Sequence, residues 1–81
     1  MNPDHIQFYQ QKRITDYGNY RLVTFENTVV PTIPKYYIGV YRGSKKIGEG
    51  EADNEQEAIR KLKARLDQSE ARGGRLEYIK L

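Results

Sequence analysis

Apolar and polar positions alternate most regularly between residues 34 and 50, and this period of two predicts a β-hairpin. Two extended runs, PKYYIGVY and KKIGEGEA, flank Gly43 and Ser44. A glycine at the first central position of a two-residue turn supplies the positive φ that tight hairpins need. The stretch therefore predicts two paired antiparallel strands.

The turn also predicts which side chains of the hairpin share a face. Tyr41 is expected to pair with Lys46, and Ile38 then lies opposite Glu49. The apolar side chains fall on one face: Tyr36, Ile38, Val40 and Ile47. The other face carries the remaining tyrosines, one lysine and the glycines: Tyr37, Tyr41, Lys46, Gly39, Gly48 and Gly50. We expect a helix to pack on the apolar face.

The pattern changes to helical spacing after the hairpin. Asp53 or Asn54 can cap the helix, and Gln56 or Glu57 three residues later completes a capping box. The apolar residues that follow form one stripe: Ala58, Ile59, Leu62 and Leu66. A stripe of this kind is typical of a surface helix that covers a sheet.

The remaining segments are less regular. Residues 1–19 have irregularly spaced apolar positions and predict a short helix or an ordered arm. Residues 20–26 are rich in aromatic and β-branched side chains and predict a first strand. Residues 27–35 form a loop, because Pro31 and Pro34 disfavour a central strand. Three apolar side chains of this loop would tuck under the sheet or bind a partner: Val29, Val30 and Ile33.

Gly73 and Gly74 predict the end of the helix, and residues 75–81 then read as a short last strand that can pair with another chain. The chain is therefore expected to be one α+β domain over residues 1–81. We predict an antiparallel sheet of three to four strands with one long helix packed on one face. Residues 1–19 form the N-terminal helix or arm, and residues 20–81 form the sheet and helix.

Composition narrows the class of protein. The chain has 81 residues, of which 37% are hydrophobic and 31% charged, and no apolar run approaches the roughly 18 residues that a membrane helix needs. It contains no cysteine, and its first residues do not resemble a secretory signal, so we expect a cytoplasmic protein without a membrane partner. A domain of this size without disulfides depends on packing, and self-association as a homodimer stays open.

Charge is distributed unevenly although the net charge is only +3. Five acids and no base lie between residues 49 and 57: Glu49, Glu51, Asp53, Glu55 and Glu57. Acids in the first turn of a helix complement its dipole, but Glu49 and Glu51 precede the helix. We interpret the acidic stretch as a candidate protein-binding site.

The sequence has few side chains that are suited to catalysis. The only histidine is His5, there is no cysteine nucleophile, and an enzyme would have to use carboxylates such as Glu49 and Glu51. Solvated glutamates on a strand are far commoner than an acid–base pair, so we expect no catalytic residues and no enzyme. No spacing indicates a metal site, and we expect no cofactor.

Nucleic-acid binding is the alternative. Aromatic and basic residues interleave on the hairpin: Tyr37, Tyr41, Arg42, Lys45 and Lys46. Bases could stack on such a platform, each contributing about 1–3 kcal/mol. Tyrosine also fills half-exposed positions of ordinary sheets, and we give that interpretation about twice the weight.

Residues 34–66 resemble the second half of a double-stranded RNA-binding domain. Residues 8–13 look like the end of the first helix of that family, residues 20–23 like its first strand, and residues 46–50 like its third strand. The lysines with which the family grips phosphate are missing, and Glu55, Gln56 and Ile59 stand in their place. The transition from hairpin to helix is also similar to the antitoxin-like fold of the HicB family. The resemblance implies the architecture, while carboxylates at the docking turn would repel an RNA duplex.

These patterns favour a small non-catalytic binding protein that acts through protein contacts and an acidic surface. A regulator or inhibitor of phage or mobile-element type fits the size and style of the sequence. Binding of RNA or DNA through the basic, tyrosine-bearing hairpin is the second hypothesis.

Overall fold

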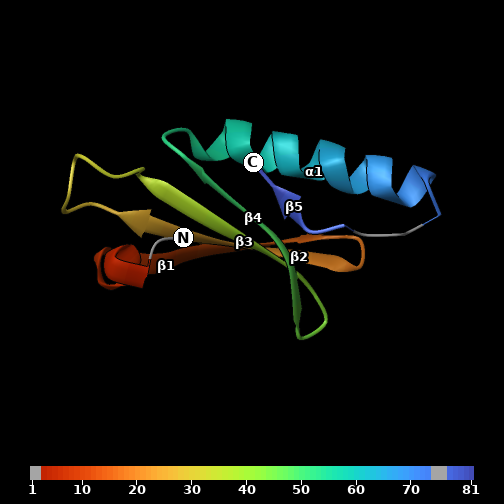
Figure 1. The fold of residues 1–81 in the computed structure, drawn as a ribbon, viewed down its shortest axis with the longest axis horizontal. Coiled ribbons are helices and arrows are strands. Elements are labelled where there is room, and N and C mark those ends of the chain that lie inside the picture. The colour runs from red at the N-terminus through yellow and green to blue at the C-terminus, as the bar shows by residue number, and fades with distance from the viewer. Residues whose placement is uncertain (1–2, 74–76) are drawn as a thin grey trace.

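A computed structural model describes residues 3–73 and 77–81, with side chains described from residue 6 onward. One five-stranded sheet carries a single long helix on one face (Figure 1). The elements in chain order are a 3₁₀ helix η1 (Pro3–Phe8), β1 (Tyr9–Tyr17), β2 (Tyr20–Asn27), β3 (Tyr36–Arg42), β4 (Lys45–Ala52), α1 (Glu55–Ala71) and β5 (Ile79–Lys80). The fold is therefore α+β, as the sequence predicts.

The sheet has five strands rather than three to four, and it is mixed rather than antiparallel. Its order follows the chain from β1 to β5, with antiparallel pairs among the first four strands and a parallel pair between β4 and β5. The C-terminal strand is shorter than residues 75–81, since only Ile79–Lys80 pair, and residues 74–76 lie outside the described residues.

We expected a helix or arm over residues 1–19. The structure has a short helix there, η1, but residues 9–17 form strand β1. Residues 8–13, which resemble the end of the first helix of the RNA-binding family, belong mostly to this strand. A turn at Gly18, with φ of 60°, folds β1 back onto β2. The strand is hard to recognise because it lies at the sheet edge, and a bulge at Lys12 interrupts the alternation of its side chains.

The hairpin forms as predicted, but its register changes at a second bulge. Tyr41 pairs with Lys46, whereas Ile38 lies opposite Gly50 and not Glu49. The bulge absorbs Ile47, which is buried in the core. The glycines of β4 consequently lie toward α1 and β5, where a Cβ on Gly48 would meet the Ile79 carbonyl oxygen at 2.8 Å. The prediction that Gly48 and Gly50 lie on the tyrosine face was wrong, because the bulge shifts the register by one residue. On the side of α1 these glycines leave room for β5.

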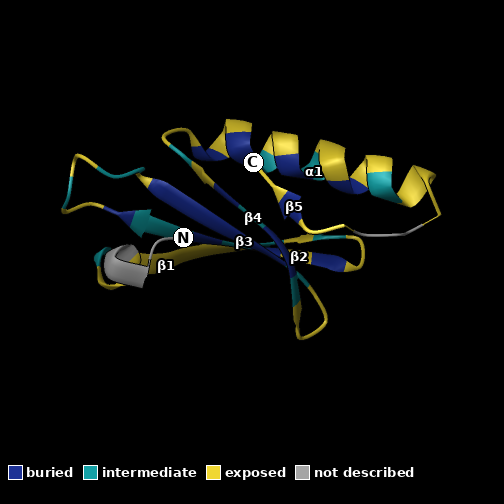
Figure 2. Ribbon diagram, in the orientation of Figure 1, coloured by how far each residue is buried: buried dark blue, intermediate teal, exposed yellow. Residues whose placement is uncertain are grey.

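The core lies between the sheet and α1. Buried side chains come from both layers: Tyr20, Leu22, Ile38, Val40, Ile47, Ala58, Leu62, Leu66 and Ile79. Figure 2 shows the buried side of α1 turned toward the sheet and its exposed side turned outward. The helix begins after Asn54, whose side chain accepts a hydrogen bond of 3.0 Å from the Glu57 amide, so Asn54 rather than Asp53 is the N-cap.

Hydrogen bonds also connect the second half of α1 to the turn between β1 and β2. The Tyr17 hydroxyl donates to Asp67 at 2.7 Å, and the Tyr20 hydroxyl donates to Glu70. These bonds to carboxylates raise the pKa of both tyrosines above its ordinary value. The helix is thus connected to β1 and β2 at its C-terminal half as well as through the core.

Candidate protein-binding site

Three of the five acids line one groove at the junction of β4 and α1. Glu51, Asp53 and Glu57 lie around it with residues of both elements and of the C-terminus: Ala52, Asn54, Ala58, Lys61, Arg65 and Leu81. The groove has a volume of about 550 Å³ and is lined by apolar side chains and by charges of both signs. We refer to it below as the acidic groove.

Asp53 and Glu57 also have structural partners. Asp53 accepts a hydrogen bond of 3.2 Å from the Lys35 amide, which joins the β2–β3 loop to the start of the helix. Glu57 lies 3.2 Å from Lys61, one helical turn along. An exposed pair of this kind contributes little to stability and remains accessible to a partner.

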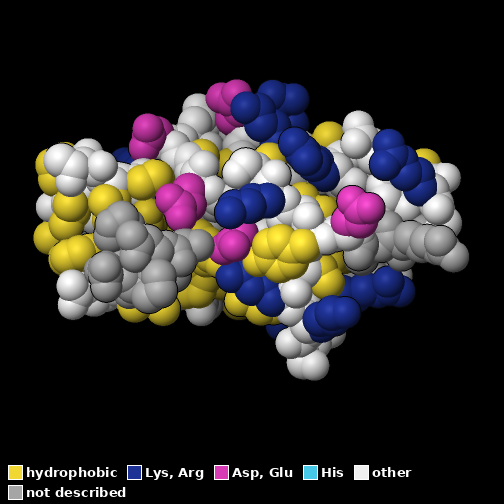
Figure 3. All heavy atoms as spheres, in the orientation of Figure 1, with side chains coloured by type: hydrophobic (Ala, Val, Ile, Leu, Met, Phe, Trp, Pro, Cys, Tyr) yellow, Lys and Arg dark blue, Asp and Glu magenta, His cyan; other side chains and the backbone are white. Residues whose placement is uncertain are grey.

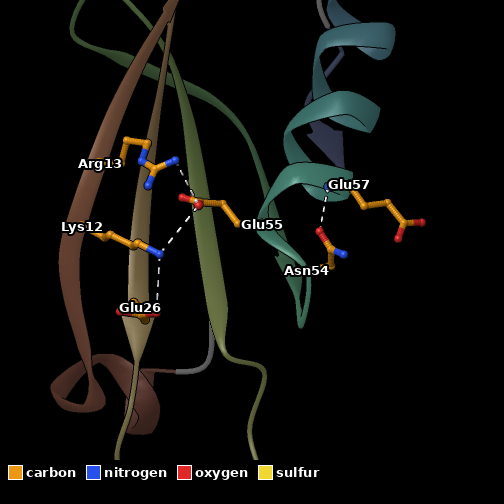
Figure 4. A network of polar contacts seen from close by, with 6 residues as sticks. All are labelled: Lys12, Arg13, Glu26, Asn54, Glu55 and Glu57. Carbon is orange, nitrogen blue, oxygen red and sulfur yellow. Dashed lines mark hydrogen bonds and ion pairs between the residues drawn. The ribbon is translucent and has the colours of Figure 1, made fainter.

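Glu55 points away from the groove toward β1. Its side chain is only 8% exposed, and its Oε1 lies 3.7 Å from Lys12 and 3.4 Å from Arg13 (Figure 4). Lys12 also lies 3.6 Å from Glu26 of β2. Burial alone would lower the pKa of Lys12, but the charges of Glu55 and Glu26 raise it. Glu55 therefore connects the first turn of the helix to the edge strand rather than belonging to an exposed acidic row.

Glu49 lies on the sheet face opposite α1, in a cluster with Tyr37 and Lys46. The Tyr37 hydroxyl donates to Glu49 at 2.7 Å, Lys46 lies 3.3 Å from the same carboxylate, and Lys46 also contacts the Tyr37 hydroxyl. Burial raises the pKa of Tyr37 to about 12. Burial would raise the pKa of Glu49 as well, but hydrogen bonds from Tyr37 and Lys46 hold it well below 4.5.

The acidic stretch is thus divided among three places in the fold. The five acids are close in sequence, at every second position. They do not form one row in the structure, because the strand ends at Ala52 and the helix begins at Glu55. The change of period turns Glu55 away from Asp53 and Glu57. Glu49 and Glu51 lie on the same strand, and Glu51, nearer to its end, lines the groove. The sequence alone could not reveal this division, because the partners of Glu55 and Glu49 lie far along the chain or depend on the β4 bulge.

An ordered loop over residues 28–35 adjoins the acidic groove. The buried Asn27 side chain donates to the Val30 carbonyl at 2.7 Å and accepts from the amides of Val29 and Val30 at 3.0 and 2.9 Å. Its own amide donates to the Lys35 carbonyl at 2.8 Å, and the Tyr9 hydroxyl donates to the Pro34 carbonyl at 2.6 Å. The loop therefore has a defined shape.

The same loop presents apolar side chains to solvent. Val29 is 71% exposed, and the groove beside the loop is lined by Val30, Pro31, Ile33 and Asp53 among others. Figure 3 shows hydrophobic side chains gathered at the end of the molecule where this loop lies in Figure 1. Asp53 lines both this groove and the acidic groove, so the two surfaces are continuous. The apolar content of residues 27–35 indicated this surface, while the organising role of Asn27 was not recognised.

The alternative site on the hairpin is only partly accessible. Tyr37 is 3% exposed, with its ring 6.3 Å from that of Tyr9 and 6.0 Å from that of Phe25. Lys46 lies 5.0 Å from the centre of the Tyr37 ring. Bases cannot stack on a ring enclosed in this way. The other three residues of the proposed site are half-buried or exposed: Tyr41, Arg42 and Lys45.

No group of three or more acidic, histidine or cysteine side chains close enough to hold a metal occurs in the described part of the chain. The side chain of His5 lies outside the described residues. None of the helices that the structure describes is both long and apolar enough to cross a membrane. No protein-family model matches the sequence, and the comparisons with curated proteins and with solved structures give no match.

Proposed function

We propose that this chain is a non-catalytic binding protein that acts through contacts with another protein. The observation that supports the proposal is the continuity of the acidic groove with the apolar loop through Asp53. An apolar centre beside a charged rim is the usual anatomy of a protein interface. The regulation or inhibition of the bound protein is the role we infer for this contact.

The order of the loop favours binding. Hydrogen bonds with the Asn27 side chain fix the backbone at Val29 and Val30, so little conformational freedom remains to be lost when a partner docks. The acids that line the groove, Glu51, Asp53 and Glu57, would favour a partner with basic side chains. The expected partner is therefore a protein with a positively charged rim.

Binding of RNA or DNA through the hairpin remains the second hypothesis. It rests on Arg42 and Lys45, which are exposed beside the half-buried Tyr41. The two basic side chains can contact phosphates, and the tyrosine ring can stack on a single nucleotide. So small a site predicts weak binding with a shallow dependence on salt. The site is smaller than the sequence predicts, because Tyr37 is enclosed and Lys46 forms an ion pair.

One experiment distinguishes the two hypotheses. Immobilised wild-type protein, a Glu51→Gln/Glu57→Gln variant and an Arg42→Gln/Lys45→Gln variant would be exposed to nuclease-treated lysate of the source cells. We expect a protein retained by the wild type and by the second variant but lost from the first. Fluorescence anisotropy with labelled duplex RNA, duplex DNA and single strands is measured in parallel. Micromolar nucleic-acid binding that falls with salt and is lost in Arg42→Gln/Lys45→Gln would overturn the proposal.

A further inference from the structure

Strand β1 lies at an edge of the sheet, and among the described residues no strand pairs with its outer side. Pairing with β2 uses the backbone groups on one side of β1, so those on the other side point outward. The bulge between Gln11 and Arg13 interrupts the first half of the strand. Residues 13–17 pair regularly with β2 and so form an edge to which a further strand can be added (Figure 1).

A groove lies beside this edge, between β1 and α1. It has a volume of about 490 Å³ and is lined by Arg13 of β1 and by one flank of the helix, which includes Ile59, Arg60, Lys63 and Ala64. At one end Arg13 lies 3.4 Å from Glu55. At the other end the Tyr17 hydroxyl donates to Asp67 at 2.7 Å. The groove therefore follows the regular part of the edge strand.

The basic side chains of the helix flank are available to a ligand. Arg60 is exposed and Lys63 is half-buried. Neither forms an ion pair with any described residue. Lys63 lies 5.1 Å from the centre of the Tyr17 ring, a contact that favours its place at the groove. The groove thus presents two cations beside the apolar Ile59.

The two carboxylates of the groove already have partners. Glu55 is buried and is contacted by Lys12 and Arg13 (Figure 4). Asp67 accepts the hydrogen bond from Tyr17. With Arg60 and Lys63, four basic side chains therefore lie in or beside the groove against two carboxylates. The excess of positive charge favours a ligand that carries carboxylates.

The opposite face of the edge strand is apolar at its centre. Thr15 pairs with Leu22, which is buried in the core beneath α1, so the preceding Ile14 points to the other face of the sheet. Ile14 is 48% exposed. Successive side chains of an added strand would point alternately into the groove and toward Ile14.

We propose that residues 13–17 and the groove bind an extended segment of another protein in which acidic residues alternate with apolar ones. The segment adds a sixth strand to the sheet, and its backbone pairs with the open edge of β1. Its carboxylates contact Arg60 and Lys63, and its apolar side chains cover Ile14. A nucleic-acid strand could satisfy the cations, but it has no regular row of N–H and C=O groups to pair with a strand edge.

This site goes beyond the proposed function. It shares no lining residue with the acidic groove, which lies on the other flank of α1, and it selects a partner of the opposite charge. The regular edge is only five residues long, so we expect a weak and transient complex.

The first test is an NMR titration of the full ¹⁵N-labelled chain with a short blocked peptide in which Asp alternates with Val. We expect the largest amide shifts in residues 13–17 and on the flank of α1 that lines the groove. A peptide in which Lys replaces Asp should bind at least tenfold more weakly, because its charge is repelled. No shifts up to about millimolar peptide, or the largest shifts around the acidic groove, would overturn the proposal.

A charge variant tests the groove directly. Arg60→Gln/Lys63→Gln should weaken binding of the Asp peptide about fivefold or more at low salt, since two cations are lost. The matched control is Arg72→Gln/Lys80→Gln, which removes the same charge from exposed positions outside both grooves and should keep the wild-type affinity. Equal affinities of the two variants would contradict a role for the groove. Circular dichroism confirms that each variant is folded.

Methylation of the peptide backbone tests strand addition. In an added strand, alternate N–H groups of the peptide face β1 and the others face solvent. N-methylation of one alternate set should therefore abolish binding, and N-methylation of the other set should not. The same effect from both sets would contradict pairing with the strand edge. Single-stranded RNA or DNA that shifts the same amides at lower concentration than the peptide would assign the groove to nucleic acid and overturn the proposal.

Discussion

The Glu55 carboxylate lies 3.4 Å from the Arg13 guanidinium, and this contact joins the first residue of α1 to the edge strand β1. Lys12 contacts the same oxygen because the bulge in β1 turns both basic side chains toward the helix. The other oxygen of Glu55, Oε2, is buried without a hydrogen-bond partner among the described residues. Two attractive contacts therefore oppose the cost of burying a carboxylate.

We expect Glu55→Gln to lower the free energy of unfolding by about 1 kcal/mol. The variant loses the negative charge that contacts Lys12 and Arg13 and that complements the helix dipole, and each of these contacts is worth about 0.3–1 kcal/mol. Part of this loss is offset, because burial of an amide costs less than burial of a carboxylate. Glu57→Gln is the matched control, since its carboxylate is exposed, and it should change stability by less than about 0.5 kcal/mol. Urea unfolding followed by circular dichroism measures both. Equal effects of the two variants would show that the contact with β1 contributes nothing.

Asn27→Ala should destabilise the fold by about 2 kcal/mol or more. The side chain is buried and makes three hydrogen bonds with the loop backbone, so its removal leaves the amides of Val29 and Val30 without their acceptor. The neighbouring Thr28→Ala, at an exposed position, should stay within about 0.5 kcal/mol of the wild type. Hydrogen exchange gives a local readout, because the Val29 and Val30 amides should lose protection first. Unchanged protection of these amides would contradict the assigned role of Asn27.

The hairpin and α1 could be predicted from the sequence because their signals are local. The turn at Gly43 and the cap at Asn54 each act within a few residues, and both lie where the sequence places them. The stripe of Ala58, Leu62 and Leu66 is likewise buried against the sheet. Short-range signals of this kind are independent of the rest of the fold.

Strand β1 could not be predicted, since it lies at the edge and most of its side chains are exposed. Its position depends on the turn at Gly18 and on pairing with β2, both of which are properties of the whole sheet. The register of β4 beyond the turn depends on the bulge at Ile47, which no local pattern marks. In this register the glycines of β4 lie against β5 and the C-terminal residue, where a Cβ on Gly48 would clash with Ile79.

The candidate site was predictable only in part for the same reason. Asp53, Glu51 and Glu57 come together because β4 passes directly into α1. The burial of Glu55 follows from β1, which the sequence did not reveal, and the enclosure of Tyr37 follows from the rings of Tyr9 and Phe25. These contacts join residues that are distant in sequence.

Gly48→Ala should destabilise the protein more than Gly39→Ala. A Cβ at residue 48 would lie 2.8 Å from the backbone oxygen of Ile79, which cannot move without displacing β5, and we expect a cost of about 1–3 kcal/mol. A Cβ at residue 39 would meet the outer part of the Tyr41 ring at 2.9 Å, and that ring can rotate away. Urea unfolding at a low protein concentration measures both variants. A larger loss for Gly39→Ala would contradict the packing of β5 on β4.

Acid should remove the stability that Glu49 contributes through Tyr37 and Lys46. Hydrogen bonds from these two side chains hold the pKa of Glu49 below its usual 4.5 in the folded chain. A lowered pKa means that the contribution is fully present above pH 4.5 and disappears as the pH falls toward the folded value.

The corresponding variant is Tyr37→Phe, which removes the hydroxyl that donates to Glu49 but keeps the ring between Tyr9 and Phe25. We expect it to lower the free energy of unfolding by about 1–2 kcal/mol at neutral pH, and by progressively less as the pH falls below 4.5 and Glu49 takes up its proton. Tyr41→Phe, on the same face, should give a difference that does not vary with pH. Urea unfolding of the three proteins across the acid range measures these differences. A difference in unfolding free energy between wild type and Tyr37→Phe that stays constant with pH would show that the hydroxyl does not interact with the ionised form of Glu49.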